Sequence, residues 1–306
     1  MAVTAALVKK LREMTGAGMM DCKKVLVETD GDIDKAVDLL REKGLSKAAK
    51  KADRIAAMGL VKTAFAADGK SAAIVEVNSE TDFVAKNDDF INFVQGLADL
   101  ALTSDAADMD AFMALSFEGG TVQEALNNKI ATIGENMNIR RFKKLNEPGV
   151  VYTGYVHGGG TIGVITGIKT DAELSAVAVC GKDVAMQVAS MNPKFMDESQ
   201  VDQAYLDHEK EVLRQEVLNE GKPEAMVDKI VAGKIKKELK EVCLVDQKFV
   251  KNSDLTVKQY IDECAKAAGT DMAIASMVRF EVGEGIEKKE EDFAAEVAAQ
   301  QAAAKK

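Results

Sequence analysis

The chain has 306 residues, 47% of them hydrophobic and 29% charged, so it is long enough for two to four modules with substantial cores. Its formal net charge of −10 argues against a general nucleic-acid binder, which needs a basic face to neutralise phosphates. Only 5% of the residues are aromatic and three are proline, which favours a largely helical protein with an aliphatic core.

The cysteines and histidines give little material for chemistry. The cysteines lie far apart and form no C-x-x-C pair, which argues against metal binding by this set: Cys22, Cys180, Cys243 and Cys264. Lys9, Lys10 and Arg12 interrupt the only signal-like start, and no long apolar segment follows, so we expect a cytoplasmic protein with reduced thiols. With His157 and His208 as the only histidines, we expect no enzyme activity, no metal and no cofactor.

Residues 1–45 predict a compact module of three helices. Thr4 can cap the first helix, the second begins at about Met19, and the third is expected to end at Gly44. Adjacent Met19 and Met20 cannot both face so small a core, so one is either simply exposed or offers a soft apolar contact to a partner. A core of this size is marginal, and such a module usually serves binding.

An internal repeat follows a basic, alanine-rich segment, residues 46–58, which predicts a helical linker. Residues 59–75 align without a gap with residues 149–165. Each copy contains alternating apolar residues, a glycine turn and a second apolar strand, which predicts a β-hairpin. Two α+β halves with antiparallel sheets are therefore expected. The first half is assigned to residues 59–145, and the second to residues 146–199 and 244–283.

Helices are expected after each hairpin, opening at Asp89 in the first half and at Asp183 in the second. Capping-box spacing at Thr121 predicts a further helix, which is expected to continue toward Arg140 and Arg141.

Residues 200–243 predict an inserted antiparallel helical hairpin, coiled-coil-like, with a turn at Gly221. His208 is interpreted as a seam or surface residue of this hairpin. Capping-box spacing at Thr256 predicts another helix. A strand over residues 275–282 is expected to return to the second sheet. The chain then reaches a C-terminal helical module in residues 284–306, with Phe293 and Val297 on its helix.

Phe83 stands among acidic and hydroxyl side chains in the polar turn of residues 79–87. Taken alone, such a residue packs back onto the core. Thr81 and Thr170 follow the two strand pairs in matching places, yet the second half has Ala172 where the first has Phe83. The comparison favours a protruding contact for Phe83, with different packing in the two halves as the alternative.

Two glycine-rich segments imitate phosphate-binding motifs. Residues 158–163 satisfy G-x-G-x-x-G, but a strand-like run follows, so a pyrophosphate would meet no helix N-terminus. Residues 69–71 resemble the end of a P-loop, but Ala64 stands where the first glycine belongs. Both segments are interpreted as hairpin turns, and we expect the protein to bind no nucleotide itself.

Five motifs in order resemble those of bacterial elongation factor Ts proteins along nearly the whole chain. They occupy residues 11–24, 80–86, 133–136, 138–141 and 279–285. The resemblance implies a ubiquitin-associated-like (UBA-like) N-terminal domain, a two-part core, a coiled-coil hairpin and a C-terminal helical module. It also implies an exchange function, in which the protein promotes release of GDP from elongation factor Tu during translation. From the net charge and the lack of a long apolar segment, we expect no direct nucleic-acid or membrane partner.

The resemblance also implies which residues meet the partner. Thr81, Asp82, Phe83 and Val84 match the family segment that enters beside the partner's magnesium site, with Phe83 as the wedge. Other family contact positions fall on Met19, Met20, Lys23, Lys51, Ile133, Gly134, His157 and Val250.

Two other functions are weighed against exchange. A UBA-like adaptor without exchange activity would lose every interaction when residues 1–45 are deleted. A nucleotide-using enzyme would bind GDP or NAD tightly on its own.

Overall fold

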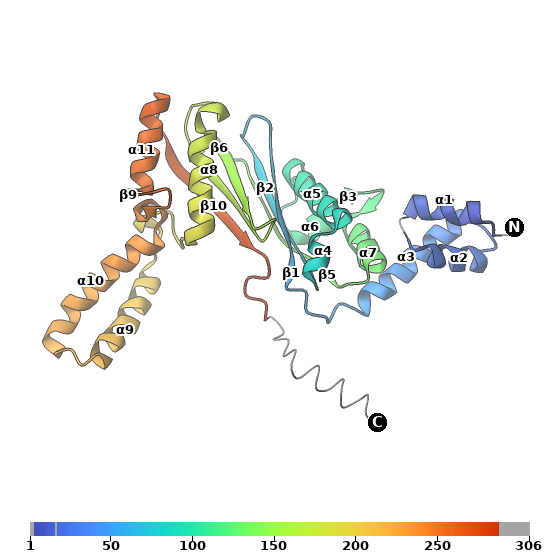
Figure 1. Ribbon diagram of the computed structural model, residues 1–306, viewed down its shortest axis with the longest axis horizontal. Coiled ribbons are helices and arrows are strands. Elements are labelled where there is room, and N and C mark those ends of the chain that lie inside the picture. Colours follow the sequence, from blue (N-terminus) through green and yellow to red (C-terminus); the bar gives the residue numbers. More distant parts are fainter. Residues whose placement is uncertain (1–2, 16, 288–306) are drawn as a thin grey trace.

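The computed structural model describes residues 3–15 and 17–287. Figure 1 shows an elongated molecule, with the helices α1 to α3 at the N-terminal end, the two larger sheets in the middle and a helical hairpin at the opposite end. Helices and antiparallel sheets coexist, which confirms the α+β class. The C-terminal helix expected around Phe293 and Val297 lies outside the described residues. The division of the chain into separate domains stays a prediction.

The N-terminal module contains three helices, as predicted: α1 (Ala5–Thr15), α2 (Met19–Glu28) and α3 (Ile33–Ala49). Its small core is formed by Val8, Leu11, Cys22, Val25, Leu26 and Ala36. The Thr4 hydroxyl accepts the backbone N–H of Leu7 at 3.2 Å, which satisfies one free donor at the start of α1.

The expected end of the third helix at Gly44 is wrong, because α3 continues to Ala49. Gly44 lies against α7 (Val122–Ile133), where an added Cβ would stand 3.7 Å from the Cβ of Ala131. The contact with α7 supports α3 past this glycine and ties the module to the core. The predicted helical linker is accordingly helical only as far as Ala49.

Each half of the core contains a three-stranded antiparallel sheet (Figure 1). The first has the order β1 (Met58–Phe65), β2 (Ala72–Ser79), β5 (Met137–Leu145), and the second β6 (Val150–His157), β7 (Ile162–Lys169), β10 (Ala273–Glu281). Both predicted hairpins and the returning strand are confirmed. The likeness of the halves extends to the third strand, which pairs with the second strand of the hairpin in each sheet.

The two hairpins differ in register. Phe65 pairs with Ala72 in the first hairpin, whereas the aligned Tyr155 pairs with Val164, two residues beyond the aligned Ile162. Side chains alternate between the faces of a strand, so a shift of two residues keeps the same side chains on the same face. The repeat therefore preserves the buried pattern while the turn is shortened.

The third strand of the first sheet corrects one prediction. The helix that starts at Thr121 has the expected capping box, but it ends at Ile133. Gly134 follows in the left-handed region with φ 92°, and the chain then enters β5, which contains Arg140 and Arg141. Both arginines lie on β5, whose backbone pairs with β2, and both side chains bond to Glu76 on β2.

A buried carboxylate links the two halves. Glu76 on β2 is 0% exposed. Its carboxylate accepts Arg141 Nε at 2.5 Å, Arg140 Nη1 at 3.1 Å and the backbone N–H of Gly283 at 2.9 Å. A buried charge is tolerated when it is paired and hydrogen-bonded in this way. Gly283 follows β10, so Glu76 anchors the end of the second half to the first.

The two sheets face each other, and the helices cover their outer faces. The residues buried between the sheets come from both halves: Val61, Ile74, Tyr152, Ile165, Val278 and Phe280. On the outer faces, α5 (Asp88–Thr103) and α7 cover the first sheet, while α8 (Leu174–Met191) covers the second and α11 (Val257–Ala268) packs against α8. The core therefore has four layers, helices, sheet, sheet and helices, and the turn after β2 projects from the first sheet.

In the first half, α5 begins at Asp88, close to the expected Asp89. In the second half, the expected start at Asp183 is wrong, because α8 begins at Leu174. Asp183 lies in the middle of α8, where its carboxylate accepts Tyr260 Oη at 2.8 Å and Lys251 Nζ at 2.6 Å. These contacts across elements explain an acidic residue inside a helix.

The helical hairpin is confirmed, with α9 (Gln203–Asn219) and α10 (Glu224–Val242) joined at Gly221. Its interior is formed by Leu206, Leu213, Val217, Val227, Val231 and Ile235, while His208 is exposed. The capping box at Thr256 is also present. The remaining elements are α4 (Asp82–Ala85), α6 (Met109–Met113), β3 (Ser116–Phe117), β4 (Gly120–Thr121), β8 (Lys248–Phe249), β9 (Asn252–Thr256) and 3-10 turns at Glu198–Gln200 and Leu244–Asp246. None of the helices within the described residues has the length and apolar character needed to cross a membrane.

Candidate functional site

The turn after β2 presents one large apolar side chain to solvent. Phe83 lies on the single-turn helix α4 and is 81% exposed. Its neighbour Val84 is 7% exposed and packs into the core of the first half. The prediction that Phe83 protrudes is confirmed. Val84, which the resemblance assigns to the contact, instead faces inward, so the exposed part of the segment is Asp82 and Phe83.

The second half has no such protrusion. Residues 170–173 connect β7 to α8 without a helical turn. Ala172 is partly buried against the second core, and its N–H bonds to the hydroxyl of Thr170 at 3.2 Å. The repeat therefore folds without an aromatic at this place, which agrees with the comparison made from the sequence.

Glu135 braces the turn that holds Phe83. Its carboxylate accepts the backbone N–H of Thr81 at 3.0 Å and the Thr81 hydroxyl at 2.7 Å. Thr81 is the N-cap of α4, yet its side chain makes no capping bond within that helix. On the other side of α4, Lys86 Nζ lies 2.6 Å from Asp82 Oδ2, and this hydrogen bond lowers the pKa of Asp82. Asp82 therefore stands paired with Lys86, directly before Phe83 in the chain.

A second brace joins the same segments. Glu80 Oε1 accepts the backbone N–H of Asn136, and Arg54 Nη1 lies 3.5 Å from the same oxygen. The Asn136 side chain donates to the carbonyl oxygens of Ala52 and Arg54, at 3.3 and 2.7 Å. Three stretches far apart in sequence therefore meet under the turn.

Three more predicted contact residues adjoin this cluster. Lys51 Nζ donates to the carbonyl oxygen of Ile130 at 3.5 Å, at the end of α7. Ile133 is partly buried at that helix end, and exposed Gly134 directly precedes the bracing Glu135. The structure thus brings Lys51, Ile133 and Gly134 together with the turn that bears Phe83.

The N-terminal module presents a second apolar surface. Met19 and Met20, at the start of α2, are 58% and 62% exposed, so neither joins the core, and Lys23 is exposed on the same helix. A groove between this module and α7 is lined by side chains from both, including Met14 and Ile133. Lys47 Nζ and Asp21 Oδ2, 2.8 Å apart, join α3 to α2 beside the groove.

The last two predicted residues lie in the second half. His157 ends β6, is exposed, and has its Nδ1 3.0 Å from the Tyr155 hydroxyl. Val250 is 46% exposed in the turn between β8 and β9, which lies far from α4 in Figure 1. A contact at Val250 would therefore be separate from the contact at Phe83.

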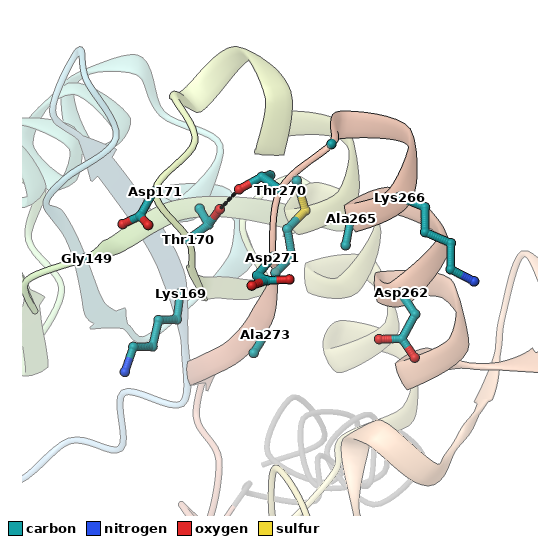
Figure 2. Close-up of a pocket in the computed structure, with 12 residues that line it drawn as sticks. Gly149, Lys169, Thr170, Asp171, Asp262, Ala265, Lys266, Thr270, Asp271 and Ala273 are labelled. Carbon is teal, nitrogen blue, oxygen red and sulfur yellow. Dashed lines mark hydrogen bonds between the residues drawn. The ribbon is translucent and has the colours of Figure 1, made fainter.

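A further surface depression lies elsewhere, between the end of α11 and the start of β10. Figure 2 shows acidic and basic side chains around it, among them Lys169, Asp171 and Asp262, with the hydroxyls of Thr170 and Thr270 3.5 Å apart. It contains none of the predicted contact residues. In residues 3–15 and 17–287, no three His, Cys, Asp or Glu side chains are placed to hold a metal ion.

Sequence reasoning missed the bracing residues, although Glu80, Glu135 and Asn136 stand in the motifs that resemble the family. A pairing between residues 54 or more positions apart leaves no local pattern. The only signal of this pairing in the sequence was a glutamate in each of two motifs, residues 80–86 and 133–136.

The described residues define an α+β protein whose candidate site is a braced, protruding aromatic side chain together with an exposed pair of methionines. This geometry suits contact with another macromolecule, because the exposed groups are apolar and soft.

The comparisons with known proteins identify the family. Residues 80–284 match the family model described as elongation factor TS. The chain is 57% identical to elongation factor Ts of Clostridioides difficile (strain 630), over 97% of this chain and 98% of that protein. It is 54% identical to elongation factor Ts of Clostridium novyi (strain NT), over 96% and 97% of the two chains. The chain belongs to the elongation factor Ts family, and its role is that of an elongation factor in protein synthesis.

Proposed function

We propose that this protein is the guanine nucleotide exchange factor of elongation factor Tu, and that it acts by inserting Phe83, with Asp82, beside the partner's magnesium and nucleotide site. The observation that carries the proposal is the 81% exposure of Phe83 on a turn braced by Glu80 and Glu135. An isolated exposed apolar residue is ordinary, but one held outward by charged braces is suited to a defined contact.

The proposed mechanism needs no acid, base or metal from this chain. A magnesium ion between a bound nucleotide and its protein ligands is a large local charge, so moving those ligands weakens the hold on GDP. A wedge does this when the complex gains more from burying the aromatic ring than it loses from disturbing the ligands. Asp82, paired with Lys86, brings a carboxylate into the same region.

Met19 and Met20 supply the second contact in this proposal. Their exposure at the start of α2 offers flexible, polarisable side chains that can adapt to a partner's surface. Binding through α2 would hold the partner while Phe83 disturbs its nucleotide site. In this proposal the methionine contact supplies affinity for the partner, and the Phe83 contact supplies the exchange activity. We propose that exchange takes place in the cytoplasm, where translation occurs.

The direction of exchange does not come from this protein. If the factor weakens GDP binding by a given ratio, GDP weakens binding of the factor by the same ratio. Exchange then proceeds through a transient ternary complex, and an excess of GTP sets its net direction.

Size-exclusion chromatography of the two proteins tests this proposal. Without nucleotide we expect a stable complex, and excess GDP is expected to dissociate it. A complex whose stability is the same with and without GDP would contradict exchange and favour a simple adaptor.

A further inference from the structure

The short helix α4 cannot hold its own orientation. It has four residues, and isolated helices this short do not persist in water. Its only buried residue is Val84. Packing of Val84 holds α4 against the core of the first half, and bonds from outside the helix add the restraint that fixes the direction of Phe83.

Thr81 receives those bonds in an unusual way. An N-cap threonine ordinarily uses its hydroxyl to accept an N–H of its own helix. Thr170, at the matching place in the second half, lies before α8 and is not its N-cap, and its hydroxyl accepts the N–H of Ala172 in the connecting segment at 3.2 Å. Thr81 instead donates both its hydroxyl and its N–H to Glu135, at 2.7 and 3.0 Å. Thr81 is therefore held through two donors by a charged carboxylate, whereas Thr170 has only the neutral hydroxyl of Thr270, 3.5 Å away, as its distant side-chain contact.

Glu135 is well suited to hold Thr81 in one orientation. A carboxylate that accepts two donors of one residue fixes both its position and its rotation, and bonds to a charged acceptor are stronger than neutral ones. Glu135 is itself set by its neighbours, because Asn136 is bound by Glu80 and by the carbonyl oxygens of Ala52 and Arg54. A continuous series of contacts therefore runs from Asn136, through the adjacent Glu135, to Thr81.

We infer that Glu135 is a positioning residue, whose bidentate grip on Thr81 fixes the direction in which Phe83 points. The inference rests on the proposed exchange function. Loss of the grip leaves the contact surface in place but lets the turn sample other orientations, so the bound partner is disturbed less often. The maximal rate of GDP release falls while the concentration of factor needed for half of that rate is unchanged.

The test measures release of labelled GDP from elongation factor Tu at rising factor concentrations. Glu135→Ala is expected to lower the maximal rate about tenfold, equivalent to about 1.4 kcal/mol, with half-saturation unchanged. Glu135→Gln should lose less, because its amide oxygen still accepts one donor. Glu263→Gln, an exposed glutamate on α11, is the matched control and should behave as the unmodified protein.

Combination with Phe83→Ala separates positioning from other roles. If Glu135 acts only through Phe83, adding Glu135→Ala to Phe83→Ala should slow release no further. If Glu135→Ala slows release as much in the Phe83→Ala background as in the unmodified protein, the inference is overturned. A Glu135→Ala variant that releases GDP as fast as the unmodified protein would also overturn it. If Glu135→Ala does not fold, Glu135→Gln and Thr81→Val provide the same comparison. A Phe83→Ala variant of unchanged rate would instead overturn the proposed exchange mechanism itself.

Discussion

Replacing Phe83 with alanine is expected to slow GDP release from elongation factor Tu while leaving the fold intact. The side chain is 81% exposed, so it contributes little to packing within this protein. Substitutions at such surface positions usually change the free energy of unfolding by less than about 0.5 kcal/mol. Phe83→Ala should therefore lower the rate of GDP release and leave the thermal stability of this protein nearly unchanged.

The size of the loss follows from the exposed area. A phenylalanine side chain presents about 200 Å² of surface, and full burial of such a residue stabilises by about 1.5 to 3 kcal/mol. Since most of Phe83 is available to a partner, we expect about 2 kcal/mol to be missing from the disturbed complex. This corresponds to a roughly 30-fold slower release at saturating factor.

Stopped-flow fluorescence with labelled GDP measures this rate, and two further variants serve as experimental controls. Val179 on α8 is 71% exposed, so Val179→Ala removes a smaller exposed apolar group from the second half and should leave the rate unchanged. Phe90 is fully buried, so Phe90→Ala should lower the free energy of unfolding by about 3 to 5 kcal/mol. A Phe83→Ala variant that releases GDP as fast as the unmodified protein would refute the wedge.

Three further predictions address the rest of the molecule. The double variant Met19→Ser, Met20→Ser should raise the factor concentration for half-maximal GDP release and leave the maximal rate unchanged; a reduced maximal rate would contradict the division of roles. Glu76→Ala should lower the free energy of unfolding by about 3 to 5 kcal/mol in urea, because it leaves two arginines facing a buried gap. Burial raises the pKa of Cys243 from 9.0 to about 11, so this thiol stabilises the fold below pH 9 and progressively less as pH rises toward 11. Iodoacetamide at pH 8 should accordingly label half-buried Cys264 and spare Cys243 in the native protein; rapid labelling of Cys243 would contradict its burial.

Local patterns in the sequence predicted much of the fold. The alternating strands and glycine turns of the repeat gave both hairpins, and the capping boxes at Thr121 and Thr256 began helices where expected. Such features depend on neighbours a few residues apart, which a sequence displays directly. The exposed position of Phe83 also followed, because the second half served as an internal comparison.

Features set by distant contacts were not predictable in the same way. Arg140 and Arg141 lie on a strand that pairs with β2, where a buried glutamate binds both, and Gly44 lies within a helix at its contact with α7. Val84 was expected at the contact but anchors α4 in the core. The grip of Glu135 on Thr81 spans 54 positions, so only the folded chain reveals it.

The most direct test of exchange uses the unmodified protein in amounts far below those of elongation factor Tu. Labelled GDP is bound to elongation factor Tu, excess unlabelled nucleotide is added, and release is followed with and without this protein. We predict that a small fraction of one equivalent accelerates release from the whole population, because each molecule leaves one partner and acts on the next. Release at the same rate with and without the protein would contradict its assignment as an exchange factor.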